Sequence, residues 1–351
     1  MKRFFLLGII VILLVYIAPI GYQYYQNQAE MGENIHTVQN VEIPADSQAS
    51  TGQDAENTAA EEAQPAQQPA HTLTVSVDGT VRELSLEDYV AGAVAAEMPA
   101  SFPDEALKAQ AVAARTFAQY KRSLGTDDTH PDAVLCDDPK HCAAYVDLDT
   151  EAEDLWGSKA AEWSEKVEQA AADTAGKIVT YNSQPIAAVF HAAAAKQTEA
   201  AVNVWGSDIP YLVAVNSTGD EACPKYDASV TCGAEEFRQI MLANYPDINL
   251  TGLPKTWFTD IQSTEAGGVT SCKVGGQEMK GTEVRALFRL NSTHFTISTT
   301  DTSITFHTQG YGHGVGMSQY GAKSMAENGS SYEEILLHYY SGTTVADIDE
   351  K

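Results

Sequence analysis

A single carboxylate, Glu97, stands in an otherwise apolar and small-residue stretch, VAAEMPASFP. The apolar positions before it recur at helical steps of three and four: Leu86, Tyr89, Val90, Ala93 and Val94. One more step of three from Val94 falls on Glu97, so the spacing predicts a buried carboxyl at the end of a helix that Pro99 terminates. Apolar surroundings and the negative helix end both disfavour its charged form. A carboxyl protonated near neutral pH suits a general acid. The alternative is a glutamate at a frayed helix end, pointing into water.

A second group of reactive residue types occupies the segment THPDAVLCDDPKHC: His130, Cys136, His141 and Cys142. Two thiolates and two imidazoles match a tetrahedral structural zinc site, and the intervening aspartates and prolines favour turns. The alternative is a disulfide between Cys136 and Cys142, which a location outside the cytoplasm would permit. A further disulfide between Cys223 and Cys232 is left open by the sequence.

A run of glycines near the C-terminus, GYGHGVGMSQYGA, places glycine at every second position from 310 to 316. The spacing differs from that of a dinucleotide-binding fingerprint. An extended chain with this pattern leaves one face without side chains, so a flat ligand could approach the backbone there. The polar candidates for contacting a ligand are His313, Ser318 and Gln319. The alternative is tight packing of this backbone against a helix.

The elements that must position these residues are both strands and helices. TLTVSVDGTVREL alternates apolar and polar residues around a turn, which predicts a hairpin, and Ser85 is suited to cap the helix that carries Glu97. A second helix is expected to begin at Pro103. His191 falls at the end of a predicted strand, where a structural histidine is the alternative to a functional one. We therefore predict an α+β fold, with a possible inserted strand-rich subdomain at about residues 220–300.

The N-terminal residues are predicted to lie outside this globular domain. Lys2 and Arg3 precede an uncharged apolar run of about 17 residues, at the short end of a membrane-spanning helix. Residues 1–27 are expected to form a membrane anchor with its N-terminus in the cytoplasm and the remaining chain outside; a signal peptide is the alternative. Residues 28–70 contain neither lysine nor arginine and predict a disordered linker. The net charge of −27 argues against a nucleic-acid partner.

Two long motifs, LEDYVAGAVAAEMPASFPDEALKAQAVAARTFA and GYGHGVGMSQYGA, together strongly resemble the stage II sporulation protein D family over roughly residues 71–346. The resemblance implies a peptidoglycan lytic transglycosylase that acts during engulfment in endospore-forming bacteria. It implies that Glu97 is the catalytic acid/base, that Arg115 lies in the substrate cleft, and that zinc binds the histidine and cysteine cluster. It also implies glycan strands without stem peptides as the substrate, and stage II sporulation proteins P and M as partners.

One segment departs from the family pattern. The family often has a serine- and glycine-rich turn after the histidine at the strand end, whereas this chain has HAAAAKQTEAAVNVWG. Alanines replace the serines, whereas His191, Lys196, Gln197 and Glu199 remain. His191, Gln197 and Glu199 are the candidates for contacting a glycan, but the family's role for the turn itself in holding glycan does not carry over to this sequence.

The implied reaction needs one carboxyl that donates and then recovers a proton, so the second carboxylate of a glycoside hydrolase is not required. Two functions of other classes stay open. One is a non-catalytic glycan-binding module that enhances a cell-wall amidase. The other is hydrolysis at a catalytic zinc ion, against which four protein ligands argue because they leave no open position for water.

Overall fold

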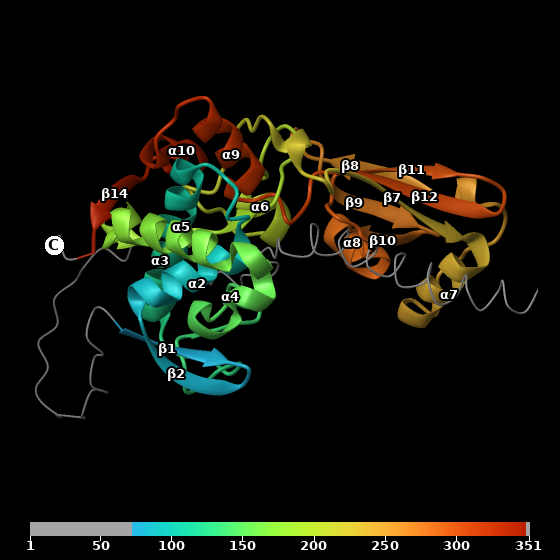
Figure 1. The fold of residues 1–351 in the computed structure, drawn as a ribbon. Helices are drawn as coiled ribbons and strands as arrows, with labels where there is room; N and C mark the ends of the chain where they lie inside the picture. The colour runs from blue at the N-terminus through green and yellow to red at the C-terminus, as the bar shows by residue number, and fades with distance from the viewer. Residues whose placement is uncertain (1–71, 349–351) are drawn as a thin grey trace, which may run out of the picture. The chain divides into compact units, whose positions relative to one another are not determined.

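The computed structural model describes residues 72–348 of the chain. The predicted anchor, residues 1–27, and the predicted linker, residues 28–70, lie outside the described residues. Within residues 72–348, no helix combines the length and the apolar character that crossing a membrane requires. The described part is a mixed α+β structure, as the sequence predicts (Figure 1).

The described chain begins with the expected hairpin. Strands β1 (Thr72–Val77) and β2 (Thr80–Ser85) pair antiparallel, and the turn residues Asp78 and Gly79 have φ angles of 49° and 73°. The two-residue strand β3 (Leu135–Cys136) pairs parallel to β1 on its other side. Ser85 caps the next helix, α2 (Leu86–Glu97), because its hydroxyl accepts a hydrogen bond from the Asp88 N–H at 3.1 Å.

Three helices pack against one another beside this hairpin: α2, α3 (Asp104–Leu124) and α5 (Ala160–Asp173) (Figure 1). Their contact faces are rich in buried alanine, which allows close approach of the helix axes. The sequence predicts one helix over residues 158–175; the structure also has an earlier, unpredicted helix, α4 (Leu148–Trp156). Gly92 of α2 lies so close to the segment after Cys142 that a Cβ there would be 2.4 Å from the Val146 carbonyl oxygen.

A second sheet packs against α3 through its strand β4 (Lys177–Tyr181). Strands β4 and β5 (Gln184–Pro185) form a hairpin with its turn at residues 182–183, and β14 (Thr344–Asp347) pairs with β4. The helices α9 (Gln319–Glu327) and α10 (Tyr332–Tyr339) pack on α3. Two short strands, β6 (Phe190–His191) and β13 (Met317–Ser318), pair in parallel and join the two regions that carry the candidate glycan contacts.

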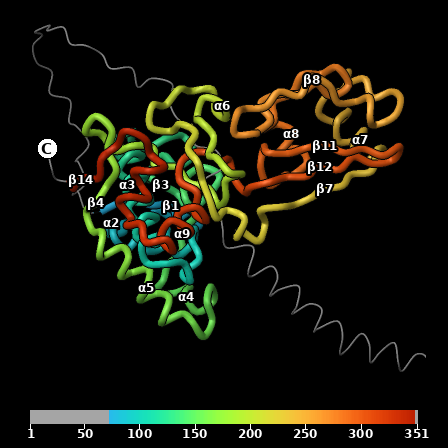
Figure 2. Tube along the Cα trace, turned by 90° about the horizontal axis from the view of Figure 1, so that it is seen from above, coloured from blue at the N-terminus to red at the C-terminus, as the bar shows by residue number. Residues whose placement is uncertain are grey.

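The strand-rich insertion has its own core. Its elements in chain order are β7 (Asp227–Gly233), α7 (Ala234–Asn244), β8 (Phe258–Ser263), β9 (Val269–Val274), β10 (Gln277–Lys280), α8 (Gly281–Phe288), β11 (Phe295–Thr299) and β12 (Ser303–Gln309) (Figure 2). The strands form two three-stranded sheets, ordered β10-β9-β8 and β11-β12-β7. Between them Phe237 stacks on Phe288, with 4.9 Å between ring centroids. Cys223 and Cys232 are both free thiols, so the disulfide that the sequence left open is absent.

Candidate active site and metal centre

Glu97 is the last residue of α2, and its side chain is fully buried, as the apolar spacing predicts. Its Oε1 accepts a hydrogen bond from the Ala144 N–H at 2.7 Å, while Oε2 has no hydrogen-bond partner among the described residues. Burial raises the pKa of the Glu97 carboxyl well above its ordinary value, and the Ala144 hydrogen bond opposes this only in part. Burial therefore favours the protonated form of the carboxyl, and its Oε2 is not used by any described group.

Gln319, the first residue of α9, reaches the end of α2. Its Nε2 donates to the Glu97 carbonyl oxygen at 2.9 Å and to Gln110 Oε1 at 3.4 Å. Within residues 72–348, the buried Gln319 Oε1 and Gln110 Nε2 atoms have no partner. Unpaired polar atoms are costly in a protein interior, so their grouping around Glu97 marks this site as one adapted to something other than stability.

Asp220 is a buried carboxyl at this site that the sequence gives no reason to select. It accepts hydrogen bonds from the hydroxyls of Ser318 and Ser217 and from the Ala194 N–H at 2.8 Å. Burial raises its pKa, and the three donors lower it in part. Ser318 also caps α9 by accepting from the Gly321 N–H at 3.2 Å. Asp220 thus holds the helix end that presents Gln319 to Glu97, and Ser318 is buried in a structural role.

The glycine run is not the extended, side-chain-free surface that the sequence predicts. All four glycines have positive φ angles, from 73° to 115°. Their backbone packs on the segment of residues 189–199: a Cβ at Gly316 would be 2.1 Å from the Val189 carbonyl oxygen, and one at Gly310 would be 2.8 Å from that of Ala193. The alternative prediction, tight packing of this backbone, is therefore correct, but the backbone packs against the irregular segment 189–199 and not against a helix.

His191 and His313 are both buried, and their ring centroids are 5.7 Å apart. Nδ1 of His191 donates to the Val315 carbonyl at 3.1 Å, and Nδ1 of His313 accepts from the Val315 N–H at 3.1 Å. Burial lowers the pKa of His191 to about 4 and lowers that of His313 well below its ordinary value. Both imidazoles are consequently neutral at physiological pH and do not face solvent.

Glu199 and Gln197 take different positions. Glu199 is buried, and its Oε1 is 2.8 Å from His294 Nε2 and accepts hydrogen bonds from Thr264 and Gly268 of the strand-rich insertion. Burial alone would raise its pKa, but these partners outweigh burial and lower it. Gln197 is half-buried and donates to Asn216 at 2.9 Å. Glu199 is thus committed to internal contacts, which argues against a direct role in glycan binding.

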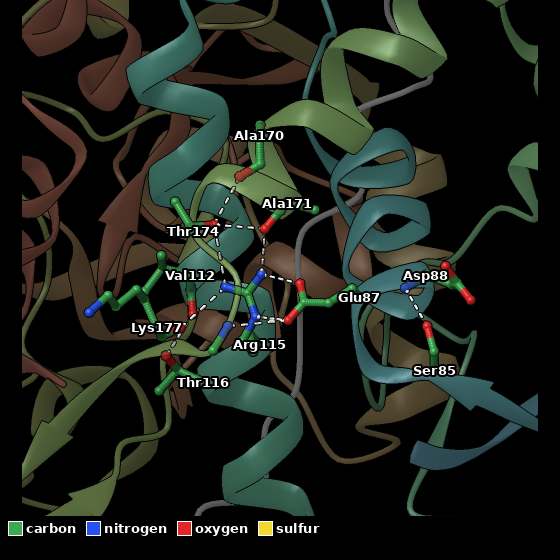
Figure 3. Close-up of polar contacts among 11 residues, drawn as sticks. Ser85, Glu87, Asp88, Val112, Arg115, Thr116, Ala170, Ala171, Thr174 and Lys177 are labelled. Atoms are coloured by element: carbon green, nitrogen blue, oxygen red, sulfur yellow. Dashed lines mark hydrogen bonds and ion pairs between the residues drawn. The ribbon is translucent and has the colours of Figure 1, made fainter. Parts of the chain in front are cut away.

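Arg115 does not line a cleft, contrary to what the family resemblance implies. Its side chain is fully buried, and its donors are all engaged within the protein (Figure 3). Nε donates to Glu87 at 2.9 Å and Nη2 pairs with the same carboxylate, while Nη1 and Nη2 donate to the carbonyls of Lys177 and Ala171 at 3.2 and 3.0 Å. A bond from Nη1 to Thr174 completes the set. Arg115 therefore joins α2, α5 and β4.

The ligand atoms of His130, Cys136, His141 and Cys142 all lie within 4.8 Å of one another. Cys142 Sγ is 3.4 Å from both His130 Nε2 and His141 Nδ1, and Cys136 Sγ is 3.6 Å from His141 Nδ1. A tetrahedral zinc ion with its usual bond lengths would hold sulfur and nitrogen ligands about 3.5 Å apart. The four residues therefore fit a zinc ion in donor type, and the three sulfur–nitrogen distances also match its spacing.

Outer contacts orient the two imidazoles. His130 Nδ1 donates to the Ala133 carbonyl at 2.7 Å, so its Nε2 carries the free electron pair toward the cluster. His141 Nε2 lies 3.4 Å from the Asp127 carboxylate, which leaves Nδ1 as its ligand atom. The cluster holds one end of the segment that covers Glu97, because Ala144 follows Cys142 by two residues.

Fold and site together define a mixed α+β domain in which a buried glutamate with a raised pKa contacts both the segment after the histidine and cysteine cluster and Gln319 of the glycine-rich motif. A family model described as stage II sporulation protein matches residues 76–181. Stage II sporulation protein D of Bacillus subtilis (strain 168) is 37% identical over 294 residues, which cover 81% of this chain and 84% of that protein. The protein of the same name from Bacillus amyloliquefaciens is 38% identical over 270 residues, covering 77% and 76% respectively.

The chain therefore belongs to the stage II sporulation protein D family. A more distant relative, the amidase enhancer of Bacillus subtilis (strain 168), is 29% identical over 306 residues. That match covers 72% of this chain but only 40% of the amidase enhancer.

Proposed function

We propose that this chain is a lytic transglycosylase that cleaves peptidoglycan glycan strands between N-acetylmuramic acid and N-acetylglucosamine during sporulation. The observation that supports this most is Glu97: a fully buried carboxyl with a raised pKa and one oxygen unpartnered among the described residues, within a motif of a family named for sporulation. Such a group can hold its proton at neutral pH until a leaving oxygen takes it.

In the proposed reaction, Glu97 first donates its proton to the glycosidic oxygen, and the bond to the anomeric carbon of N-acetylmuramic acid breaks. Positive charge develops at the sugar ring. The Glu97 carboxylate then removes the proton of the C6 hydroxyl of the same residue, and that oxygen bonds to the anomeric carbon. The products are a 1,6-anhydro end and a free N-acetylglucosamine hydroxyl. Glu97 regains its proton, and no water is consumed.

The proposal requires that substrate reaches a side chain that is closed off in this structure. The group that directly covers Glu97 is the Ala144 N–H, in the segment that follows Cys142. Movement of this short segment would free Oε1 and give a saccharide access. Gln319 and Gln110, whose buried side chains keep atoms unpaired within the described part of the chain, then offer hydrogen-bonding groups to the sugar.

We also propose that the histidine and cysteine cluster binds a structural zinc ion. Zinc would fix the loop from His130 to Cys142, and with it the segment over Glu97. Four protein ligands leave no position for a reactive water, so the proton transfers belong to Glu97.

The proposal also includes the location and the partners of the chain. Residues 1–27 form a single membrane anchor, with the domain outside the membrane. The substrate is denuded glycan strands, and the partners are stage II sporulation proteins P and M.

A second candidate function is supported by the amidase-enhancer relative and by the enclosure of Glu97. In this alternative the domain binds glycan without cleaving it, and it stimulates a separate cell-wall amidase.

Product analysis separates the two functions. Purified glycan strands without stem peptides would be incubated with the wild-type chain and with Glu97→Gln, and the products identified by mass spectrometry. The transglycosylase proposal predicts 1,6-anhydro ends from the wild type and none from Glu97→Gln, with glycan binding retained by both. Absence of cleavage by the wild type, together with stimulation of an added amidase, would favour the second function.

A further inference from the structure

The turn that departs from the family pattern contains a lysine in an unusual conformation. Lys196 has a φ angle of 82°, in the left-handed region that favours glycine. For a residue with a Cβ, that conformation costs about 1–2 kcal/mol. The turn itself is well fixed, because the Lys196 carbonyl accepts a hydrogen bond from the Ser217 N–H at 2.8 Å. A strained position that carries lysine instead of glycine indicates that the side chain has a use.

Lys196 is exposed at a groove that does not include Glu97. The groove has a volume of about 600 Å³ and is lined by polar side chains of β7, β11 and β12, among them Ser229, Thr296 and Gln309. Hydroxyl and amide groups of this kind suit the hydroxyls of a sugar. Among residues 72–348, Lys196 forms no ion pair, so its ammonium is available to a ligand.

The other charged or titratable groups of the groove already have partners. His294 pairs with Glu199 at 2.8 Å, and both ring nitrogens of His307 bond to serine hydroxyls at 2.9 Å. Asp227 accepts a hydrogen bond from the Gln309 amide at 3.2 Å. Of the residues that line this groove, Lys196 therefore carries a positive charge without an ion-pair partner, in a chain with a net charge of −27. Asp227 is exposed in the same groove and keeps its negative charge, because the Gln309 amide that it binds is neutral.

The same segment connects the groove with the candidate active site. The Ala192 carbonyl accepts hydrogen bonds from Ser318 and Tyr320, on either side of the Gln319 that contacts Glu97. The Cα atoms of Ala192 and Lys196 are at most about 14 Å apart, because an extended chain spans no more than about 3.6 Å per residue. A polysaccharide that enters the active site is long enough to reach the groove as well.

We infer that Lys196 binds the lactyl carboxylate of N-acetylmuramic acid on a strand that has lost its stem peptides. This inference rests on the proposed function for its substrate class. In an intact strand the lactyl group is tied up in an amide bond to the peptide, and hydrolysis of that bond leaves a carboxylate. A denuded strand thus carries a carboxylate on the lactyl group of each N-acetylmuramic acid, whereas the carboxylates of an intact strand lie on its stem peptides. This acidic chain would repel such a carboxylate without a local cation. Lys196 supplies that cation and makes the groove selective for denuded strands.

The test is equilibrium binding, measured by calorimetry on the full-length chain carrying Glu97→Gln so that no cleavage occurs. The ligands are a denuded oligosaccharide containing N-acetylmuramic acid, the same fragment with its stem peptides, and an N-acetylglucosamine oligomer without carboxylates. We expect Lys196→Gln to weaken binding of the denuded fragment about three- to tenfold at low salt, and binding of the other two ligands by less than about twofold. The loss should shrink as the salt concentration rises.

Two further variants keep this test independent of folding. Lys196→Gly suits the positive φ angle, so it should lose the same affinity while its melting temperature stays equal or rises. Lys255→Gln, at an exposed lysine of the insertion outside the groove, should change no affinity.

The inference is overturned if Lys196→Gln leaves the affinity for the denuded fragment unchanged, or if it weakens binding of all three ligands alike. It is also overturned if the chain that keeps Lys196 shows no measurable binding of the denuded fragment. Selective loss for the denuded fragment would support Lys196 even if product analysis shows that the chain cleaves nothing, so this result and the transglycosylase test can fail separately.

Discussion

Glu97 shows how one side chain can be prepared for proton transfer by its position alone. It ends a helix, so the negative helix end adds to the effect of burial, and the Ala144 N–H is its one hydrogen-bond donor within residues 72–348. Its pKa is raised well above the ordinary value. A buried carboxyl with a raised pKa destabilises the fold at neutral pH. Such a loss of stability is expected for a catalytic residue.

The raised pKa of Glu97 has a consequence for stability. As pH rises from the ordinary glutamate pKa of about 4.3 toward the raised folded value, the unfolded chain releases a proton that the folded chain retains, so stability falls by up to about 1.4 kcal/mol per pH unit. Glutamine cannot ionise. Denaturant unfolding should therefore show Glu97→Gln gaining stability relative to wild type between about pH 5 and pH 7. A difference in stability between the two chains that does not change with pH would refute the raised pKa.

Arg115 is expected to contribute to the stability of the fold and not to substrate binding. Replacing it by methionine keeps an unbranched chain but removes the guanidinium donors from Glu87 and from the Ala171 and Lys177 carbonyls. The free energy of unfolding should fall by about 3 kcal/mol, measured by denaturant unfolding. The matched change Arg82→Met removes an exposed ion pair to Asp147 and should cost less than about 1 kcal/mol. A fully stable Arg115→Met chain with lost glycan affinity would restore the cleft assignment.

At the scale of elements, the glycine run lets its own backbone pack directly against the backbone of residues 189–199. Its pairing with residues 189–199 places α9, and so Gln319, against the end of α2. Small residues are required there because main-chain atoms of the partner segment occupy the space that a side chain would need. The polar residues of the run are mostly structural, with Gln319 as the member that reaches the candidate active site.

Two glycines with the same φ angle of 73° separate steric from conformational cost. A Cβ added at Gly79 would have no atom within 4 Å, whereas one added at Gly316 would be 2.1 Å from the Val189 carbonyl oxygen. Gly79→Ala should cost about 1–2 kcal/mol through its backbone conformation. Gly316→Ala should cost that amount and about 1–3 kcal/mol more, from overpacking. Equal losses in thermal unfolding of the two variants would show that the close approach at Gly316 is unimportant.

The loop with the four potential zinc ligands is the other element that shapes the site. We predict that the purified chain binds one zinc ion, and that chelation or Cys136→Ser lowers the melting temperature, with recovery on adding zinc to the chelated wild type. Elemental analysis and thermal unfolding measure the two effects. Loss of turnover on chelation with no change in melting temperature would instead favour a catalytic ion.

At the scale of the whole molecule, sequence reasoning succeeded where signals are local. The hairpin before α2, the cap at Ser85, the helix containing Glu97 and the helix after Pro103 follow from turn residues and apolar spacing. The burial of Glu97 followed for the same reason. Family membership followed from two long motifs and is confirmed by the relatives.

What the sequence could not predict depends on contacts between distant segments. Arg115 gains its role from groups up to 62 residues away, and Asp220 gains its role from Ser318, 98 residues further on. The glycine run was expected to be extended, because its positive φ angles are set by a partner segment that periodicity does not reveal. The conformation of Lys196, likewise, emerges only once the turn is folded.

The central claim, that Glu97 catalyses an internal ring closure without water, is tested most directly by cleaving denuded glycan in water enriched in heavy oxygen. Mass spectrometry would then read each product end. The account predicts 1,6-anhydro ends that carry no heavy oxygen with the wild-type chain, and no cleavage with Glu97→Gln. Heavy oxygen at the new reducing ends, or unchanged cleavage by Glu97→Gln, would contradict it.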